Sequence, residues 1–550
     1  MHRMTRVAET ADLRAPFDGR TFRFKEDAVK LTRAANDRFV AISSRSFGDH
    51  VYRVTRVIGG RYREDFAGVE VAEARRGAPV LNSAKDELIL PVTFVYSPPS
   101  FRLKGYSVMV GERPGLKAGG IWNQTCIFCH NTAPYFSSLL GELLGPSAPG
   151  YQGEVVDRLL PRQRRAALSI TSEEDLVRAA ADELRFLSRE DVAARRTDVP
   201  GALAALIRAT KTGFDASHLV EIGIGCESCH GGSRQHVADV KQKPSFAIRS
   251  TFVQVMPSRW EIAKRATSEV RSINRTCARC HQVLFSRYPF TWEGGERNGD
   301  AGGSHISSGE ARDFLLGGCT TALSCAACHD PHAADAPEKL RFLETSSGNA
   351  VCLRCHGEFE ERGKLAQHSH HDPAGAGAVC IECHMPKKNM GLGYNLTRYH
   401  RIGSPTDRAR VEEDRPLECA LCHADKSVGE LVGAMERFWG KRYDREKLVA
   451  LYGELDASPL LATLARGKAH EQATAIHVLG EHRMSGALLP VAGQLVNRYP
   501  LVRYFAREAL EKLVGRPCDV NLDQDDAAIQ AEATRWLASV RSKIAAGRAP

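Results

Sequence analysis

The pentapeptide C-x-x-C-H occurs seven times in this chain of 550 residues, and three of the copies lie between Cys325 and His384. The motif is typical of covalent c-type haem attachment, in which both thiols add to the vinyl groups of one porphyrin. The histidine after the second cysteine then becomes an axial ligand of the iron. The cysteines are Cys126, Cys129, Cys226, Cys229, Cys277, Cys280, Cys325, Cys328, Cys352, Cys355, Cys380, Cys383, Cys419 and Cys422, and the histidines are His130, His230, His281, His329, His356, His384 and His423.

Chance and zinc binding both fail to explain this pattern. With 16 cysteines and 20 histidines in the chain, about 0.02 such pentapeptides are expected at random. A zinc site would use C-x-x-C units in pairs, whereas here a histidine follows the second cysteine every time. The sequence therefore predicts seven covalently attached haem c groups, and we number their sites one to seven in chain order.

Each iron needs a second axial ligand to become six-coordinate, and eight further histidines are candidates. They are His218, His236, His305, His332, His368, His370, His371 and His400. His236 and His332 follow a motif histidine too closely to reach the opposite face of the same iron, so each would serve a neighbouring haem. Met256 and Met390 are alternatives. Mostly bis-histidine coordination predicts low reduction potentials, because methionine ligation raises them.

The net charge does not point to nucleic acid. The formal charge is +9 without cofactors, and each ferric haem c adds about −1, so seven haems lower the total to about +2. No patch of interleaved basic and aromatic residues is present. No apolar run is long enough to cross a bilayer. The expected partners are therefore redox proteins.

Covalent haem attachment takes place outside the bacterial cytoplasm, so a periplasmic or extracellular location is expected. The first residues, MHRMTRVAETADLRAPFDG, contain no apolar h-region and no cleavage site. A signal peptide is therefore expected upstream of this sequence. Cys319 and Cys518 remain outside the motifs, and we interpret them as two unrelated thiols, with a disulfide as the alternative in an oxidising compartment.

The length predicts a multidomain protein of two to four domains, and three regions differ in character. Residues 1–118 predict a small β-rich domain, whose clearest strand, in ELILPVTFVYS, alternates with a period of two and contains Pro91, which indicates an edge strand. Residues 119–430 predict a seven-haem cytochrome c domain with sparse, mainly α secondary structure, because little polypeptide is available for each macrocycle. Residues 431–550 predict α-helical HEAT-like repeats, a candidate docking surface for a partner.

Local signals predict particular elements. RFVAISS and VYRVTRVIGG are β-rich. SEEDLVRAAADELRFL predicts a helix with Ser172 as its N-cap, and an amphipathic pattern predicts a helix between Pro500 and Gly515. His470, His477 and His482 lie far in sequence from any haem motif and are interpreted as surface or packing residues. Deletion of residues 435–550 is therefore expected to leave the haem ligands in place.

Several stretches between residues 119 and 430 resemble the family of multihaem c-type cytochromes related to the cytochrome that accepts electrons from hydroxylamine oxidoreductase. They are NQTCIFCH, GCESCHGGSRQH, SCAACHDPH, HSHH followed by CIECHMPK, and RYHRIGSPTD followed by ECALCHADK. Members with this order often end in helical repeats. The resemblance implies that His236, His332, one of His368 or His371, and His400 are distal ligands. It does not imply whether the protein is an enzyme or a carrier.

Two functions remain in competition. The first is a heptahaem protein that transfers electrons between redox partners. The alternative is a multihaem oxidoreductase that acts on a small nitrogen or sulfur oxyanion at one haem without a sixth ligand. If one haem is open, site one is favoured, because it is the most isolated in sequence and lies among Trp122, Phe128 and Tyr135. A docking or assembly role through the C-terminal helices is compatible with the first function, and no catalytic residue is assigned.

Overall fold

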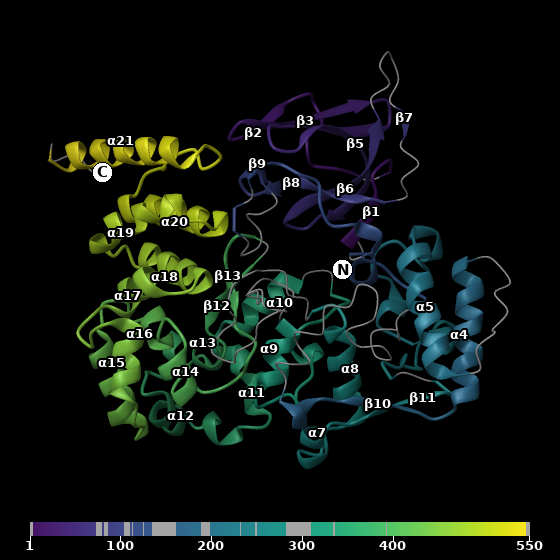
Figure 1. Cartoon of the computed structure of the whole chain (residues 1–550). Coiled ribbons are helices and arrows are strands. Elements are labelled where there is room, and N and C mark those ends of the chain that lie inside the picture. Colours follow the sequence, from purple (N-terminus) through teal and green to yellow (C-terminus); the bar gives the residue numbers. More distant parts are fainter. Residues whose placement is uncertain are drawn as a thin grey trace. The chain divides into compact units, whose positions relative to one another are not determined.

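The structure is a computed structural model of the whole chain (Figure 1). It describes residues 4–10, 12–72, 80–81, 86–103, 111–112, 114–124, 126–134, 161–188, 198–231, 233–247, 250–281, 310–333, 336–391 and 393–545. His305 and Tyr135 lie outside these ranges.

The chain divides into two compact units, and the division passes through the region expected to be a single haem domain. Unit 1 consists of Met1–Lys104, Arg113–Val283 and Thr321–Ser324, and unit 2 of Gly105–Glu112, Leu284–Thr320 and Cys325–Pro550. Haem sites one to three therefore belong to unit 1, together with the β-rich region. Sites four to seven belong to unit 2, together with the C-terminal helices.

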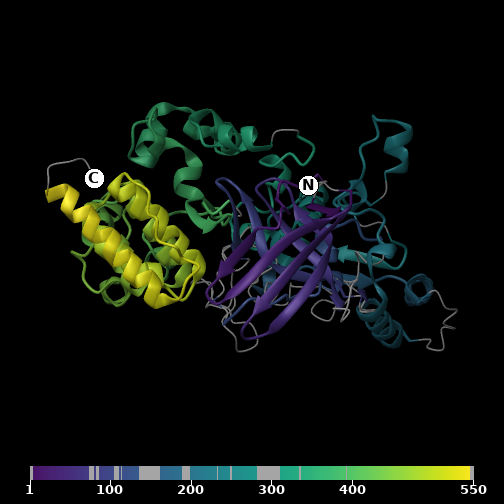
Figure 2. The same ribbon diagram turned by 90° about the horizontal axis from the view of Figure 1, so that it is seen from above.

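Unit 1 contains an antiparallel sheet, seen from above in Figure 2. The strand order is β2-β3-β4-β5-β6-β8-β9, with β1 paired to β5 and β7 paired to β6. The strands are β1 (Thr5–Val7), β2 (Thr21–Phe24), β3 (Asp27–Ala34), β4 (Asp37–Ser44), β5 (Gly48–Gly59), β6 (Arg63–Ala72), β7 (Val80–Leu81), β8 (Leu88–Tyr96) and β9 (Pro99–Leu103). The β-rich N-terminal region predicted from alternation is thus confirmed.

The prediction of an edge position from Pro91 is wrong, because β8 pairs with β6 on one side and β9 on the other. Two features let the strand tolerate a residue that lacks an N–H group. The register with β6 shifts between Asp65 and Ala67, and pairing with β9 begins only at Val92. Proline therefore lies where the ladder is interrupted rather than at an edge.

Hydrogen bonds connect the segment before the first haem motif to this sheet. Gly119 N donates to Ile89 O at 2.9 Å, and Trp122 N donates to Glu87 O at 2.7 Å. The buried Asp27 carboxylate accepts from Leu116 N at 2.6 Å and from the Ser44 hydroxyl at 2.7 Å. Site one consequently starts directly beside β8.

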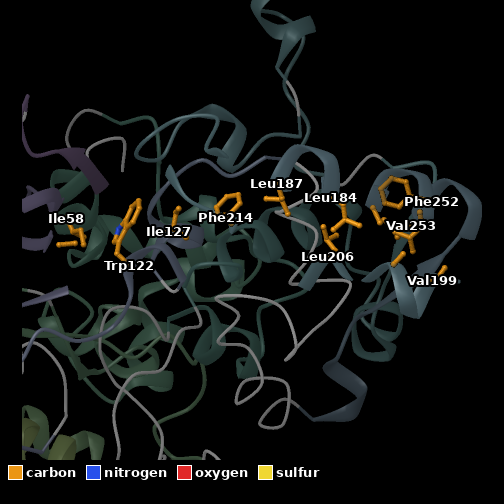
Figure 3. Packing of buried hydrophobic residues seen from close by; sticks show 14 residues of the cluster. Ile58, Trp122, Ile127, Leu184, Leu187, Val199, Leu206, Phe214, Phe252 and Val253 are labelled. Carbon is orange, nitrogen blue, oxygen red and sulfur yellow. The ribbon is translucent and has the colours of Figure 1, made fainter. Parts of the chain in front are cut away.

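An apolar core continues from the sheet to two helices of unit 1, α4 (Glu173–Ser188) and α5 (Val199–Gly213). Figure 3 follows it from Ile58 and Trp122 through Ile127 and Phe214 to Leu206. The predicted N-cap of α4 is present, since Ser172 Oγ accepts from Asp175 N at 3.2 Å. Because Ile127 is fully buried within the first motif, site one rests on a conventional protein core.

The remaining elements of unit 1 are short. They are α1 (Ile127–His130), β10 (Ala167–Ile170), α6 (Arg234–Ala238), β11 (Val253–Met256), α7 (Arg259–Ala263) and α8 (Ser268–Ala278). Strands β10 and β11 form a two-stranded antiparallel sheet.

Unit 2 begins with short elements around the haem motifs and continues into stacked helices (Figure 1). The first group is α9 (Glu310–Leu316), α10 (Ala336–Leu343), α11 (Ala350–Leu353), α12 (Arg362–Ser369), α13 (Cys380–His384), β12 (Lys387–Met390), β13 (Leu396–Arg398) and α14 (Arg408–Glu413). The second is α15 (Val428–Trp439), α16 (Arg445–Tyr452), α17 (Pro459–Arg466), α18 (Ala469–Glu481), α19 (Leu488–Ala492), α20 (Pro500–Val514) and α21 (Asp526–Ala545).

The amphipathic helix expected before Gly515 is confirmed as α20. Gly515 ends it with a φ of +75°, a left-handed conformation that glycine adopts without a steric penalty. Helix α15 runs across residue 430, so the haem segment and the helical tail meet within one helix. No helix among the described residues is long and apolar enough to span a membrane.

Candidate haem-binding sites

Each haem motif forms a single helical turn. In six of the seven, the histidine N–H donates to the carbonyl of the first cysteine at 2.9–3.0 Å, and the remaining motif is helix α13, Cys380–His384. Residues i, i+3 and i+4 of a helical turn project from the same face. Both thiols and the imidazole of a motif therefore point toward one macrocycle, which fits covalent haem c.

In unit 2, three motif histidines each face a histidine from a distant part of the chain. The ring centres of His329 and His400 are 6.1 Å apart, with an angle of 20° between the ring planes. His384 and His368 are 5.9 Å apart at 9°. The rings of His423 and His371 are also 5.9 Å apart, at 30°.

This spacing fits an iron between the two rings. A metal–imidazole bond of about 2 Å, plus about 1 Å from the nitrogen to the ring centre, separates two opposed ligands by about 6 Å. Ordinary aromatic contacts also occur at such distances. Among the described residues, however, every pair of facing histidine rings combines one motif histidine with one histidine from outside the motifs. Ordinary aromatic packing would not produce this regular pairing.

Backbone hydrogen bonds orient one ring in each pair. The Nδ1 atom of His384 lies 2.9 Å from Gly403 O, that of His400 lies 2.9 Å from Arg398 O, and that of His371 lies 2.6 Å from Ser369 O. An Nδ1–H group that donates to a carbonyl leaves the lone pair on Nε2, the atom available to a metal. The resemblance implied one ligand from His368 and His371, whereas both face a motif histidine here.

Burial favours the neutral, metal-binding form of these rings. It lowers the pKa of His384 and the pKa of His368 below the usual value for histidine. Burial also raises the pKa of the Cys383 thiol to about 11 and that of Cys419 to about 12.

Site five differs from its neighbours. No described histidine ring faces that of His356, whose ring instead lies 6.3 Å from Phe359. The side chain of His356 is 56% exposed, but His329 and His423 are also exposed, so the missing ring partner rather than exposure distinguishes site five. Of the other candidates in unit 2, His305 lies outside the described residues, and His332 is exposed. His370 is engaged elsewhere, with its Nε2 atom 3.1 Å from Phe438 O.

In unit 1, the three motifs are linked by hydrogen bonds. Arg279, in the third motif, donates from Nη2 to Ser228 O in the second motif at 2.7 Å. The hydroxyls of Ser228 and Thr132, the latter two residues after the first motif, are 2.9 Å apart. The thiols of Cys129 and Cys280 are within hydrogen-bonding reach of each other. Sites one, two and three are therefore close neighbours.

His218 is the best-placed distal candidate in unit 1. Its ring is buried, and Nδ1 lies 3.0 Å from the Asp215 carboxylate. Its Nε2 atom is buried and has no hydrogen-bond partner among the described residues, an arrangement that is costly unless a ligand such as a metal satisfies it. The ring packs against Phe214, which stacks on Phe128 of the first motif. His236 is half-buried, with Nδ1 2.9 Å from Gln242 O.

The motif cysteines of unit 2 lie near one another in the order of the sequence. Cys328 of motif four lies near Cys352 of motif five, and Cys352 is within hydrogen-bonding reach of Cys380 of motif six. Cys383 of motif six lies near Cys422 of motif seven. Outside the motifs, Cys319 lies near Cys352, whereas Cys518 is buried in the C-terminal tail.

Buried ion pairs beside the haem motifs were not expected from the sequence. Lys388 Nζ donates to the Asp414 carboxylate at 2.6 Å, and Arg415 Nε donates to Glu471 at 3.1 Å. Ligand atoms of Asp414, His470 and Glu471 all lie within 4.8 Å of one another. Because the two cations already compensate both carboxylates, we interpret the group as a salt-bridge network. The available signal in the sequence was the pair of adjacent ionisable residues, His470 and Glu471, at the start of a helix.

A family model and a curated relative support a multihaem c-type cytochrome. A family model described as a doubled CXXCH motif matches residues 319–361, which include motifs four and five. The chain is 24% identical over 221 residues to the multiheme cytochrome MtrA of Shewanella baltica (strain OS185), which is 40% of this chain and 48% of the relative. It thus spans about half the length of this curated relative. The crystal structure of the outer cell wall cytochrome OcwA aligns with 84% of this chain and 88% of its own at 13% identity, with a TM-score of 0.27.

Proposed function

We propose that this chain, a multihaem c-type cytochrome by its motifs and its relative, carries seven haems and transfers electrons between redox partner proteins outside the cytoplasm. The observation that carries the proposal is the set of three histidine pairs, His329–His400, His384–His368 and His423–His371. Haem c would supply an iron that changes between the ferric and ferrous states. Two axial imidazoles hold such an iron six-coordinate and leave no position for a substrate.

The protein would determine the order of the haem sites and the orientation of their axial ligands. The cysteine contacts support a sequence of neighbouring sites from four to seven in unit 2, with site three adjacent to sites one and two in unit 1. The hydrogen bonds from Nδ1–H of His384, His400 and His371 to backbone carbonyls fix the rotation of these three rings. We further propose that His218 and His236 serve haems in unit 1, and that the C-terminal helices form HEAT-like repeats that dock a partner.

The test is a pyridine haemochrome assay on protein matured in a host with c-type assembly machinery. We expect seven haems per chain, and the oxidised protein should show mainly low-spin signals in electron paramagnetic resonance. Five or fewer haems would contradict the seven-site proposal. Predominantly high-spin iron would contradict bis-histidine ligation even if all seven haems were attached.

A second candidate function is reduction or oxidation of a small oxyanion at one open haem. The sequence favoured site one for this role, but there Trp122 is fully buried and Phe128 stacks on Phe214. Site five is the better candidate, because no described histidine faces His356. Either the iron of site five is open, or His305 is its distal ligand. Carbon monoxide binding to the reduced wild-type protein and to a His305→Ala variant distinguishes these two cases. Binding in the wild type together with turnover of nitrite or hydroxylamine would favour an enzyme, and binding that appears only in the variant would identify His305 as a ligand.

A further inference from the structure

Helix α15 is attached to the haem region at both ends. At its N-terminus it begins five residues after His423, and Ser427 and Glu430 form a capping box that fixes its first turn. Ala424 and Val428 at this junction are buried. The start of the helix is therefore held close to the motif histidine of site seven.

At its other end, α15 contacts the loop that carries the distal histidines. Trp439 Nε1 donates to His368 O at 2.9 Å. His368 lies in the last turn of α12, where carbonyl groups lack partners within the helix. The indole thus satisfies a backbone group of the very residue whose imidazole faces His384.

His370, one of the two residues between the distal ligands, is also held by α15. His370 has a φ of +55°, an unfavourable left-handed conformation for a residue with a Cβ atom. Its ring stacks on Phe438 at 4.7 Å and 19°, and meets Trp439 edge-on at 4.9 Å and 88°. Its Nε2 atom lies 3.1 Å from Phe438 O. These contacts stabilise the chain reversal that directs His368 and His371 to different motif histidines.

We propose that α15 is a rigid support that holds the distal ligands of sites six and seven in position, with Trp439 and His370 as positioning residues. Twelve residues of helix extend over about 18 Å, so one rigid element connects the motif histidine of site seven to the loop carrying both distal ligands. The inference rests on the proposed function, because it concerns the ligation of haems that the function requires. It predicts that the two distal imidazoles loosen when the C-terminal end of α15 releases the loop.

The experiment compares three full-length variants. Trp439→Phe removes the indole donor but keeps a ring. His370→Gly removes the ring contacts while relieving the backbone strain, because glycine adopts a positive φ freely. The matched control is Trp536→Phe, which loses an indole hydrogen bond of similar length, 3.1 Å to Pro517 O, within the C-terminal tail.

Haem content, carbon monoxide binding to the reduced protein and the urea midpoint are measured for each variant. We expect the first two variants to keep the wild-type haem count but to bind more carbon monoxide, with new high-spin signal, whereas the control loses stability alone. If His370 had a purely structural role, the glycine variant would differ from the wild type in stability alone and would be unchanged in carbon monoxide binding.

The outcomes separate this inference from the proposed function. A wild-type protein with few haems contradicts the proposed function. The supporting role of α15 is contradicted if the wild type carries all its haems but the Trp439→Phe and His370→Gly variants bind no more carbon monoxide than Trp536→Phe. As an internal check, Trp439→Phe in a His368→Ala background should add less carbon monoxide binding than it does alone, since both changes act on the same iron.

Discussion

Replacement of His400 by alanine tests the assignment of a distal ligand most directly. The His400 ring lies 6.1 Å from that of His329, so its removal should open one coordination position at site four. One open haem out of seven corresponds to about 14% of the iron, and the reduced protein should bind about one more equivalent of carbon monoxide per chain than the wild type does. The lost hydrogen bond from Nδ1 to Arg398 O should cost only about 1 kcal/mol of stability.

The matched control is His477→Ala, because His477 is a largely buried histidine of α18 that packs against Phe505 rather than a motif histidine. Carbon monoxide titration with electron paramagnetic resonance gives the number and spin state of the open haems. His400→Met provides a second variant that retains a ligand, and it should keep the iron six-coordinate while raising the reduction potential of one haem. The assignment is wrong if His400→Ala binds no more carbon monoxide than His477→Ala, or if His400→Met leaves every potential unchanged.

Three further predictions concern stability and the tail. Burial lowers the pKa of His477 to about 4, whereas in the unfolded chain this histidine takes up its proton near pH 6.5. The free energy of unfolding should therefore fall by up to about 3 kcal/mol as the pH drops through this interval. Urea titrations of His477→Leu should show a weaker dependence of stability on pH. Lys388→Met leaves the Asp414 carboxylate buried without its cation and should cost about 3–5 kcal/mol by chemical denaturation, part of which Asp414→Asn in the same chain recovers. The sequence alone predicted that deletion of residues 435–550 leaves the haem ligands in place, but this deletion removes Trp439, which contacts His368, and should therefore increase carbon monoxide binding. A deletion of 441–550 that retains α15 should increase it less, and equal binding by the two truncations would contradict a role for the end of α15.

The sequence alone determined the elements whose signals are local. A C-x-x-C-H motif holds both covalent attachments and one axial ligand within five residues, so the attachment sites follow from spacing without any knowledge of the fold. Strand β8 and helix α20 were likewise predicted, because alternation and the 3.6-residue period report which face of an element is buried. The error at Pro91 arose because a proline indicates a missing backbone donor but not whether an edge or a register shift accommodates it.

Only the tertiary structure decided which distant histidine faces each motif. A distal ligand approaches the iron from the opposite face, and nothing in sequence spacing restricts where in the chain it originates. His400 lies 71 residues after its partner His329, whereas His368 precedes His384 by 16 residues. The role of His370 was equally hidden, since its neighbours in the HSHH run face motif histidines while its own ring packs on α15. Covalent attachment is local chemistry and can be read from the chain, but axial pairing depends on how distant segments pack.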